Sequence, residues 1–176
     1  GSRILKYVRE QTNELCMKAE QMDGYTLRYV REQTPEICMA AVKQNGAVLQ
    51  YVNDPTPEIC LEAIKQNIQA LAFISEQTPE MCIIAIKQNY KTLQYVKNQT
   101  EELCMMAIKQ NCNALNYVKN QTEKMTLYAV KCDGISIRCV MDITPKICQY
   151  AVKQNGLALQ YIRNQTPELC LEAVRE

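Results

Sequence analysis

Cysteine is the residue of this 176-residue chain with the most chemistry to offer, since the sequence holds ten cysteines and no histidine. Seven of them recur at 22 residues or a multiple of 22: Cys16, Cys38, Cys60, Cys82, Cys104, Cys148 and Cys170. Such regularity marks one structural position repeated along a fold. Equivalent atoms of stacked helical units lie roughly 9–10 Å apart, beyond the Cα separation that a disulfide allows. We therefore expect small, buried, reduced thiols, in the cytoplasm or another reducing intracellular compartment.

Catalytic, metal and cofactor sites are not predicted. Without histidine a cysteine nucleophile lacks its usual base, and the sequence has no CxxC, paired-carboxylate, P-loop or dinucleotide pattern. Cys112, Cys132 and Cys139 fall outside the repeated position. For these three, a reactive thiol and a drifted surface position both stay open. We expect a protein that is not an enzyme and that binds no metal and no cofactor.

The period of 22 residues also dictates the elements that carry these cysteines. The stretch QTPEICMAAVKQNGAVLQYVND, residues 33–54, recurs in varied form along the chain. Units begin near residues 11, 33, 55, 77, 99, 121, 143 and 165, and residues 1–10 form a half-unit at the start. We number the positions of a unit 1–22 from these residues. The pattern predicts a single repeat array over residues 1–176.

Each unit begins with the signals of a helix start. Threonine holds position 2 of every unit, proline follows it in five, and glutamate usually comes next. These residues suit an N-cap, the first helical position and the positive helix end. In the unit that begins at Gln33, a helix should run from Pro35 to about Gln44. Asn45, a residue type that tolerates the left-handed conformation, should end it and can cap the next helix, a shorter one from about Ala47 to Asn53.

Two rows of apolar residues predict how the helices pack. Alanine holds position 9 in all eight units, and leucine or isoleucine holds position 17. The small residue lets two helix backbones approach closely, and the larger one fills the space beside it. We therefore predict an all-α fold, an α-solenoid of about eight tandem helix-turn-helix repeats that is incomplete at both ends.

The runs AVKQNG, NQTPELC and ALQYIRN resemble an uncharacterised family of short helical tandem repeats, a domain of unknown function of giant amoeba-infecting viruses and some bacteria. The resemblance covers nearly the whole chain. It implies a tandem helical scaffold and no known catalytic residue. The unit of residues 121–142 departs most from the pattern, with Thr126, Cys132 and Cys139 at changed positions. We expect irregular stacking there.

Positions that vary between units are free of the packing rule, so a partner could be read there. Position 8 becomes large and apolar or aromatic in four consecutive units, on what should be an exposed ridge. Lysines replace the usual glutamate beside it in two of these units. The candidate partner-binding residues are Ile84, Met106, Lys124, Tyr128, Lys131, Lys146, Tyr150 and Lys153. Exposed apolar rows mark partner sites, and tyrosine among basic residues suits an acidic protein. A helix that buries more of its circumference, or a contact with another copy, would also explain the row.

The balance of charged residues bears on whether the partner is a protein or a nucleic acid. Lysine and arginine number 20 against 19 aspartate and glutamate, which argues against a general polyanion binder. A nucleic-acid binder would instead use the tyrosines of position 19 and the basic residues of position 21, which include Arg9, Arg31 and Lys97. Acidic residues lie directly beside that basic row. No apolar run is long enough to span a bilayer, so no membrane is expected. A protein partner is the expectation, and nucleic acid is the alternative.

Both ends of the chain carry half of a helix pair. Ile4, Leu5, Tyr7 and Val8 at one end could complete the seam that Leu169, Cys170, Ala173 and Val174 leave open at the other. Such head-to-tail contacts close into rings or continue as filaments. The sequence therefore also predicts homo-association through the ends, as a structural assembly module.

Overall fold

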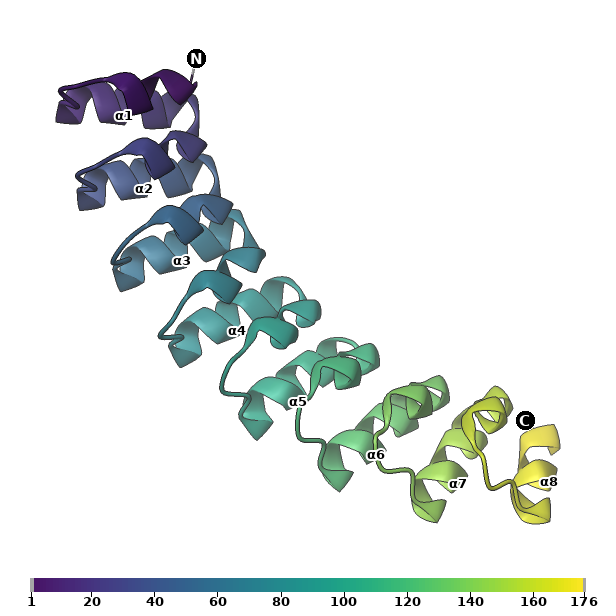
Figure 1. The fold of residues 1–176 in the computed structure, drawn as a ribbon. Helices are drawn as coiled ribbons and strands as arrows, with labels where there is room; N and C mark the ends of the chain where they lie inside the picture. The colour runs from purple at the N-terminus through teal and green to yellow at the C-terminus, as the bar shows by residue number, and fades with distance from the viewer. Residues whose placement is uncertain (1, 176) are drawn as a thin grey trace. The chain divides into compact units, whose positions relative to one another are not determined.

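The computed structural model describes residues 2–175, and every regular element within them is a helix (Figure 1). Gly1 and Glu176, the two ends of the expected array, lie outside the described residues. The α-helices are α1 (Asn13–Met22), α2 (Pro35–Gln44), α3 (Pro57–Gln66), α4 (Pro79–Gln88), α5 (Glu101–Gln110), α6 (Glu123–Cys132), α7 (Pro145–Gln154) and α8 (Pro167–Arg175). Between them lie 3₁₀ helices: η1 (Ser2–Tyr7), η2 (Gly24–Tyr29), η3 (Gly46–Tyr51), η4 (Ile68–Phe73), η5 (Tyr90–Tyr95), η6 (Cys112–Tyr117), η7 (Gly134–Cys139) and η8 (Gly156–Tyr161). The expected fold class of tandem helix pairs is confirmed.

The α-helices begin where the sequence predicts. The Thr34 hydroxyl accepts a hydrogen bond of 3.4 Å from the backbone N–H of Ile37, and Pro35 is the first helical residue of α2. Hydrogen bonds from its own backbone N–H and from the Thr34 hydroxyl hold the pKa of Glu36 below its ordinary value. The same threonine cap begins every α-helix from α1 to α8.

The residue between the two helices is extended, so the left-handed conformation expected of it is wrong. Asn45 has φ −156° and ψ 109°. No residue of the described part, glycine included, has a positive φ. Its backbone N–H donates to Ala41 O, and its side-chain oxygen accepts from the N–H of Ala47 at 2.9 Å. One residue thereby closes α2 and caps the next helix. That helix is a six-residue 3₁₀ helix, shorter than predicted.

The chain divides into two compact parts, residues 1–97 and 98–176. We call them the first unit and the second unit, to distinguish them from the 22-residue units of the repeat. In each unit the same repeat positions build the core. Ala41, Ala63 and Ala85 in the first unit, and Ala107, Ala129 and Ala151 in the second, are fully buried. The leucines of position 17, such as Leu71 and Leu115, are also fully buried. The predicted pairing of a small and a large residue is therefore the core of both units.

Glycine at position 14 serves a close approach between repeats. A Cβ atom added to Gly46 would lie 2.2 Å from the carbonyl oxygen of Ala63 in the next repeat. At Gly134 the corresponding distance, to Ala151 O, is 2.3 Å. The backbone carbonyl cannot move away without disturbing α3 or α7, so Gly46 and Gly134 have no room for a side chain, whereas other repeats carry Ile68, Tyr90 and Cys112 at position 14.

Glutamine at position 1 joins consecutive turns, a role that the sequence analysis missed. The side-chain N–H₂ of Gln77 donates to Leu71 O at 2.9 Å and to Tyr95 O at 2.8 Å. Its oxygen accepts from the backbone N–H of Lys97 at 2.8 Å and lies 4.0 Å from the Cys82 thiol. Gln33 and Gln121 make the corresponding backbone bonds. We call this arrangement the glutamine clamp.

The unit of residues 121–142 keeps the element lengths of its neighbours. Thr126 replaces the usual cysteine there, and its buried hydroxyl donates to the carbonyls of Thr122 and Glu123.

No helix among the described residues has the length and apolar character needed to cross a membrane.

Candidate interaction surface

The candidate partner-binding residues lie on the first helices of consecutive repeats. Met106, Tyr128 and Tyr150 hold position 8 of α5, α6 and α7 in the second unit, whereas Ile84 holds it on α4 in the first. Ile84, Met106 and Tyr128 are half-buried, and the Tyr150 side chain is 37% exposed. The ridge is therefore less exposed than the sequence suggests, and its most exposed large residue is Tyr150.

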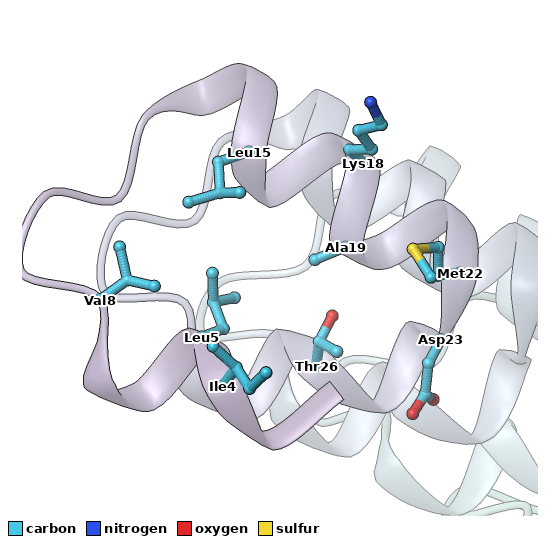
Figure 2. Close-up of a pocket in the computed structure, with 9 residues that line it drawn as sticks. All are labelled: Ile4, Leu5, Val8, Leu15, Lys18, Ala19, Met22, Asp23 and Thr26. Atoms are coloured by element: carbon cyan, nitrogen blue, oxygen red, sulfur yellow. The ribbon is translucent and has the colours of Figure 1, made fainter. Parts of the chain in front are cut away.

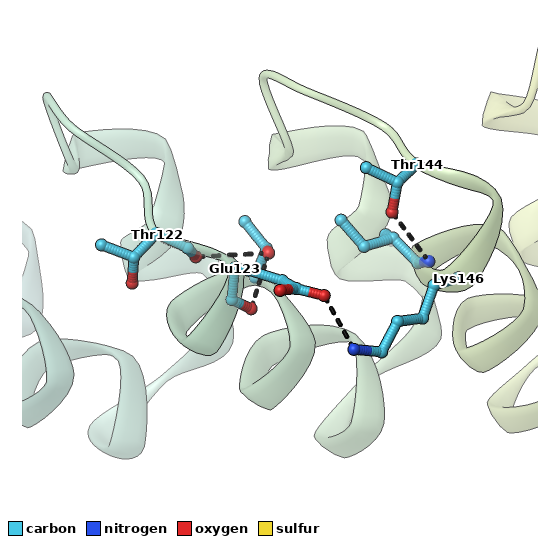
Figure 3. A network of polar contacts seen from close by, with 6 residues as sticks. Thr122, Glu123, Thr144 and Lys146 are labelled. Atoms are coloured by element: carbon cyan, nitrogen blue, oxygen red, sulfur yellow. Dashed lines mark hydrogen bonds and ion pairs between the residues drawn. The ribbon is translucent and has the colours of Figure 1, made fainter.

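Two of the lysines form ion pairs between repeats. Lys124 Nζ lies 2.5 Å from Glu101 Oε1, and Lys146 Nζ lies 2.8 Å from Glu123 Oε1. Figure 3 shows Lys146, close to the start of α7, reaching back to Glu123 at the start of α6. The Glu123 carboxylate raises the pKa of Lys146. All four side chains are exposed, so solvent screens both pairs and each adds little to stability.

A signal for these pairs was present in the sequence. Position 3 is proline in five units but glutamate at residues 101 and 123, and position 4 of the following unit is lysine both times. The two exchanges therefore compensate each other across 23 residues. Taken without this exchange, Lys124 and Lys146 suggest a basic patch for an acidic partner.

A third lysine holds the exposed tyrosine. Lys131 Nζ, from α6, lies 4.3 Å from the centroid of the Tyr150 ring on α7. This cation–π contact holds the ring against the preceding repeat while one part of it stays exposed. Lys153 is exposed and lines a cleft of about 470 Å³ together with Leu169, Glu168 and Glu172 of α8 and its neighbours. The structure thus brings aromatic, basic and acidic side chains together on α6, α7 and α8.

Two of the three off-pattern cysteines, Cys112 and Cys132, lie near Tyr128. The Tyr128 hydroxyl contacts the Cys132 thiol, which raises the pKa of Tyr128, and Cys132 also contacts the Cys112 thiol. Cys132 is exposed, Cys112 is half-buried and Cys139 is buried. Burial raises the pKa of Cys139.

The periodic cysteines have a different setting. Six of them are buried, Cys170 is half-buried, and burial raises the pKa values of those six: Cys16, Cys38, Cys60, Cys82, Cys104 and Cys148. Several lie beside the oxygen of the glutamine clamp, at 3.8 Å for Cys38. Within residues 2–175, no three histidine, cysteine, aspartate or glutamate side chains form a group that could hold a metal ion.

The basic residues of position 21 bind the chain itself. The Arg31 guanidinium donates to the carbonyls of Arg9 and Val8, at 2.9 and 3.2 Å. Lys97 Nζ donates to Ser75 O at 3.1 Å. These bonds link consecutive turns of the first unit, so both side chains have a structural role in this row.

The residues expected to join the ends are partly exposed. A cavity of about 540 Å³ is lined by Ile4, Leu5 and Val8 of the first half-unit and by Leu15 and Met22 of α1 (Figure 2). Within this set Leu5 is buried, Val8 is half-buried and Ile4 is exposed; Tyr7, nearby, is exposed. On α8, Leu169, Cys170 and Ala173 are half-buried and Val174 is exposed.

The repeat itself matches a known family. The sequence model of the domain of unknown function DUF4116 matches residues 34–78, 56–100 and 78–123, with starts 22 residues apart. The overlapping matches extend over residues 34–123, which is just over half of the chain. The chain belongs to the DUF4116 family. The expected membership of a helical repeat family of unknown function is thereby confirmed. No curated protein and no solved structure matches the chain.

Proposed function

We propose that this DUF4116 chain is a non-enzymatic scaffold that binds a protein partner through α6 and α7. The observation that carries the proposal is Tyr150, the most exposed of the four large residues that follow one another at position 8, where the other four units have small or charged residues. Its ring is 37% exposed and is held by Lys131. An aromatic side chain that is fixed in advance loses little conformational entropy on binding, and tyrosine is enriched in the residues that dominate interface energies.

The charges beside Tyr150 refine the kind of partner. Lys124 and Lys146 already have carboxylate partners, so a purely acidic partner would have to displace Glu101 and Glu123. Lys131 and Lys153 carry no carboxylate in an ion pair that the structure records. We infer a protein segment with an apolar or aromatic anchor for the Tyr150 ring and a carboxylate for one of these lysines.

Site-specific photo-crosslinking tests the proposal. A photo-reactive phenylalanine analogue replaces Tyr150 in one variant and Ala40, the same repeat position of α2, in a matched control. In an extract of the source organism, the residue-150 variant should crosslink a discrete protein that the residue-40 variant does not. Excess unlabelled wild-type chain should compete for it, and excess Tyr150→Ala chain should compete at least about tenfold less well.

The competing class predicts a different result. If the chain binds nucleic acid, a labelled single-stranded RNA should bind with an affinity that falls linearly in a plot of log K against log salt concentration. Crosslinks to nucleic acid alone, or the same proteins captured at residues 40 and 150, would refute the proposed surface.

A further inference from the structure

Cys112 and Cys132 place two thiols together in the second unit. Cys112 is the first residue of η6, and Cys132 is the last residue of α6. Burial raises the pKa of Cys112, and the nearby Cys132 thiol raises it further; the Tyr128 hydroxyl lies close to Cys132 from one turn earlier in α6. Two neighbouring thiols, one of them exposed, are the starting arrangement for a disulfide.

The repeat explains why these two side chains meet. Cys112 holds position 14 of its unit, and Cys132 holds position 12 of the next. At the same two positions of the first unit, a Cβ atom added to Gly24 would lie 3.4 Å from the Cβ atom of Gln44. This distance is just below the range of about 3.5–4.5 Å that separates the Cβ atoms of bridged cysteines.

A second pair of residues supports the same geometry. One repeat after the cysteines, the backbone N–H of Gly134 donates to the side-chain oxygen of Gln154. These residues again hold positions 14 and 12 of consecutive units. Positions 14 and 12 of consecutive units are therefore neighbours at two other places in the chain, Gly24 with Gln44 and Gly134 with Gln154.

We propose that Cys112 and Cys132 are a modification site, a dithiol that forms a reversible disulfide between consecutive repeats when a low-molecular-weight disulfide such as oxidised glutathione is present. Nothing in this step depends on the proposed partner. The bridge would close a loop of residues 112–132 and fix the end of α6 to the start of η6.

The chemistry has two exchange steps. The Cys132 thiolate attacks one sulfur of the small disulfide, whose S–S bond breaks and releases one thiolate. Cys112 then loses its proton and attacks Cys132 Sγ in this mixed disulfide, and the second small thiol leaves. In sum, two electrons and two protons pass from the two cysteines to the small disulfide, which becomes two thiols.

The exposure of each cysteine determines which of the two exchange steps it carries out. Cys132 is exposed and can be reached by the oxidant, whereas Cys112 is half-buried. Burial, with further contributions from Cys132 and Asp133, raises the pKa of Cys112 to about 11. Tyr128 also faces the pair from α6. Because the thiolate is the attacking species, the second step should be slow at pH 7 and should accelerate up to about tenfold per pH unit towards pH 9.

Peptide mapping of the whole chain tests the proposal. The chain is equilibrated in glutathione buffers of rising oxidised fraction, alkylated after unfolding and digested with trypsin. Cleavage after Lys109, Lys119, Lys131 and Arg138 places Cys112 and Cys132 in separate peptides, with Cys139 in a third. We expect one linked product that joins residues 110–119 to residues 132–138.

Three variants make the outcome decisive. Cys112→Ser should stop at a glutathione adduct on Cys132, Cys132→Ser should form neither product, and Cys139→Ser should bridge as the wild type does. The wild-type bridge should resist reduction at least about tenfold better than the adduct, because the attacking thiol is held nearby. A link from Cys132 to Cys139, or a stable adduct in the wild type at pH 9, would overturn the proposal.

Discussion

The side-chain oxygen of Gln77 accepts a 2.8 Å hydrogen bond from the backbone N–H of Lys97, twenty residues further along the chain. The same amide donates to Leu71 O and Tyr95 O, so one half-buried side chain satisfies three backbone groups of two successive turns. The clamp thereby links two successive turns of the array. The loss of stability that follows removal of the clamp can be measured.

Gln77→Ala should lower the free energy of unfolding by about 1–3 kcal/mol, because the three backbone groups lose a partner in a partly buried site. Urea denaturation followed by circular dichroism measures this. Gln94→Ala is the matched control, since the Gln94 amide bonds only Lys91 O within its own turn. Equal effects of the two substitutions would show that the clamp adds nothing specific.

Residue 143 offers the reverse experiment, because isoleucine occupies the clamp position there and is 43% exposed. Ile143→Gln should recreate the bonds to the turn that contains Tyr161 and Arg163 and raise stability by about 0.5–1.5 kcal/mol. Ile143→Ala controls for the loss of the exposed apolar side chain. The expectation fails if the glutamine variant is no more stable than the alanine variant.

Local chemistry explains which parts of the fold the sequence could predict. The threonine cap and the first-position proline act within four residues, so Thr34 and Pro35 predict the start of α2 without any knowledge of tertiary structure. The alanine and leucine rows were also predictable, because a period that repeats through the whole chain can only reflect packing. The extended Asn45 was not, since the same residue type serves left-handed and extended caps equally well.

The surface depended on contacts that local patterns do not contain. Lys146 and Glu123 lie 23 residues apart, and each is an ordinary exposed residue on its own helix. Only their exchange in consecutive units indicated a pair. The contact of Cys112 with Cys132 likewise joins position 14 of one unit to position 12 of the next, which requires the stacking geometry.

Glu20 should make the first repeat sensitive to pH. It is fully buried at a position that other units fill with valine or isoleucine, and within the described residues its Oε2 atom has no hydrogen-bond partner. Thr26 donates to its other oxygen. Burial raises the pKa of Glu20 from 4.5 to about 7, against the smaller effect of the Thr26 hydrogen bond.

The sign follows from proton binding. Between pH 4.5 and 7 the folded state holds a proton that the unfolded state has released, so stability should fall as pH rises through this range. Glu20→Val should remove the dependence and raise stability by about 1–4 kcal/mol at pH 8. Glu20→Gln should also flatten the profile but gain less, because it keeps a buried polar group. Thermal unfolding measured from pH 4 to 9 checks this dependence. A midpoint temperature that rises between pH 4.5 and 7 would contradict it.

The contact of Lys131 with Tyr150 should have a measurable coupling energy. Tyr150→Ala and Lys131→Ala should each cost about 0.5–1.5 kcal/mol, and the double variant should cost less than their sum by about 0.5–1 kcal/mol. Urea denaturation of the four proteins measures the cycle. Additive effects would mean that the lysine does not hold the ring and that Tyr150 is not fixed in advance of binding.

The apolar cavity beside η1 predicts self-association of this chain in solution. Elsewhere in the first unit, the α-helix of the preceding repeat covers the corresponding faces, as α1 does on α2 and η2. On α8, Leu169, Cys170, Ala173 and Val174 hold the positions that pack in this way in other repeats. A copy of α8 from a second molecule therefore fits the cavity lined by Ile4, Leu5 and Val8.

Light scattering over a concentration series tests this contact. The average mass of the wild-type chain should rise with concentration, and Ile4→Glu with Val174→Glu should abolish the rise, because each substitution places a charge in the apolar contact. Both residues are exposed, at 66% and 86%, so the variant should keep its fold; Leu5 is buried and is a poor choice for the same purpose. Lys91→Glu, on the exposed part of η5, is the control for added negative charge. A wild-type mass that stays monomeric at the highest concentration, or a rise that Ile4→Glu with Val174→Glu leaves intact, would exclude association through these two faces.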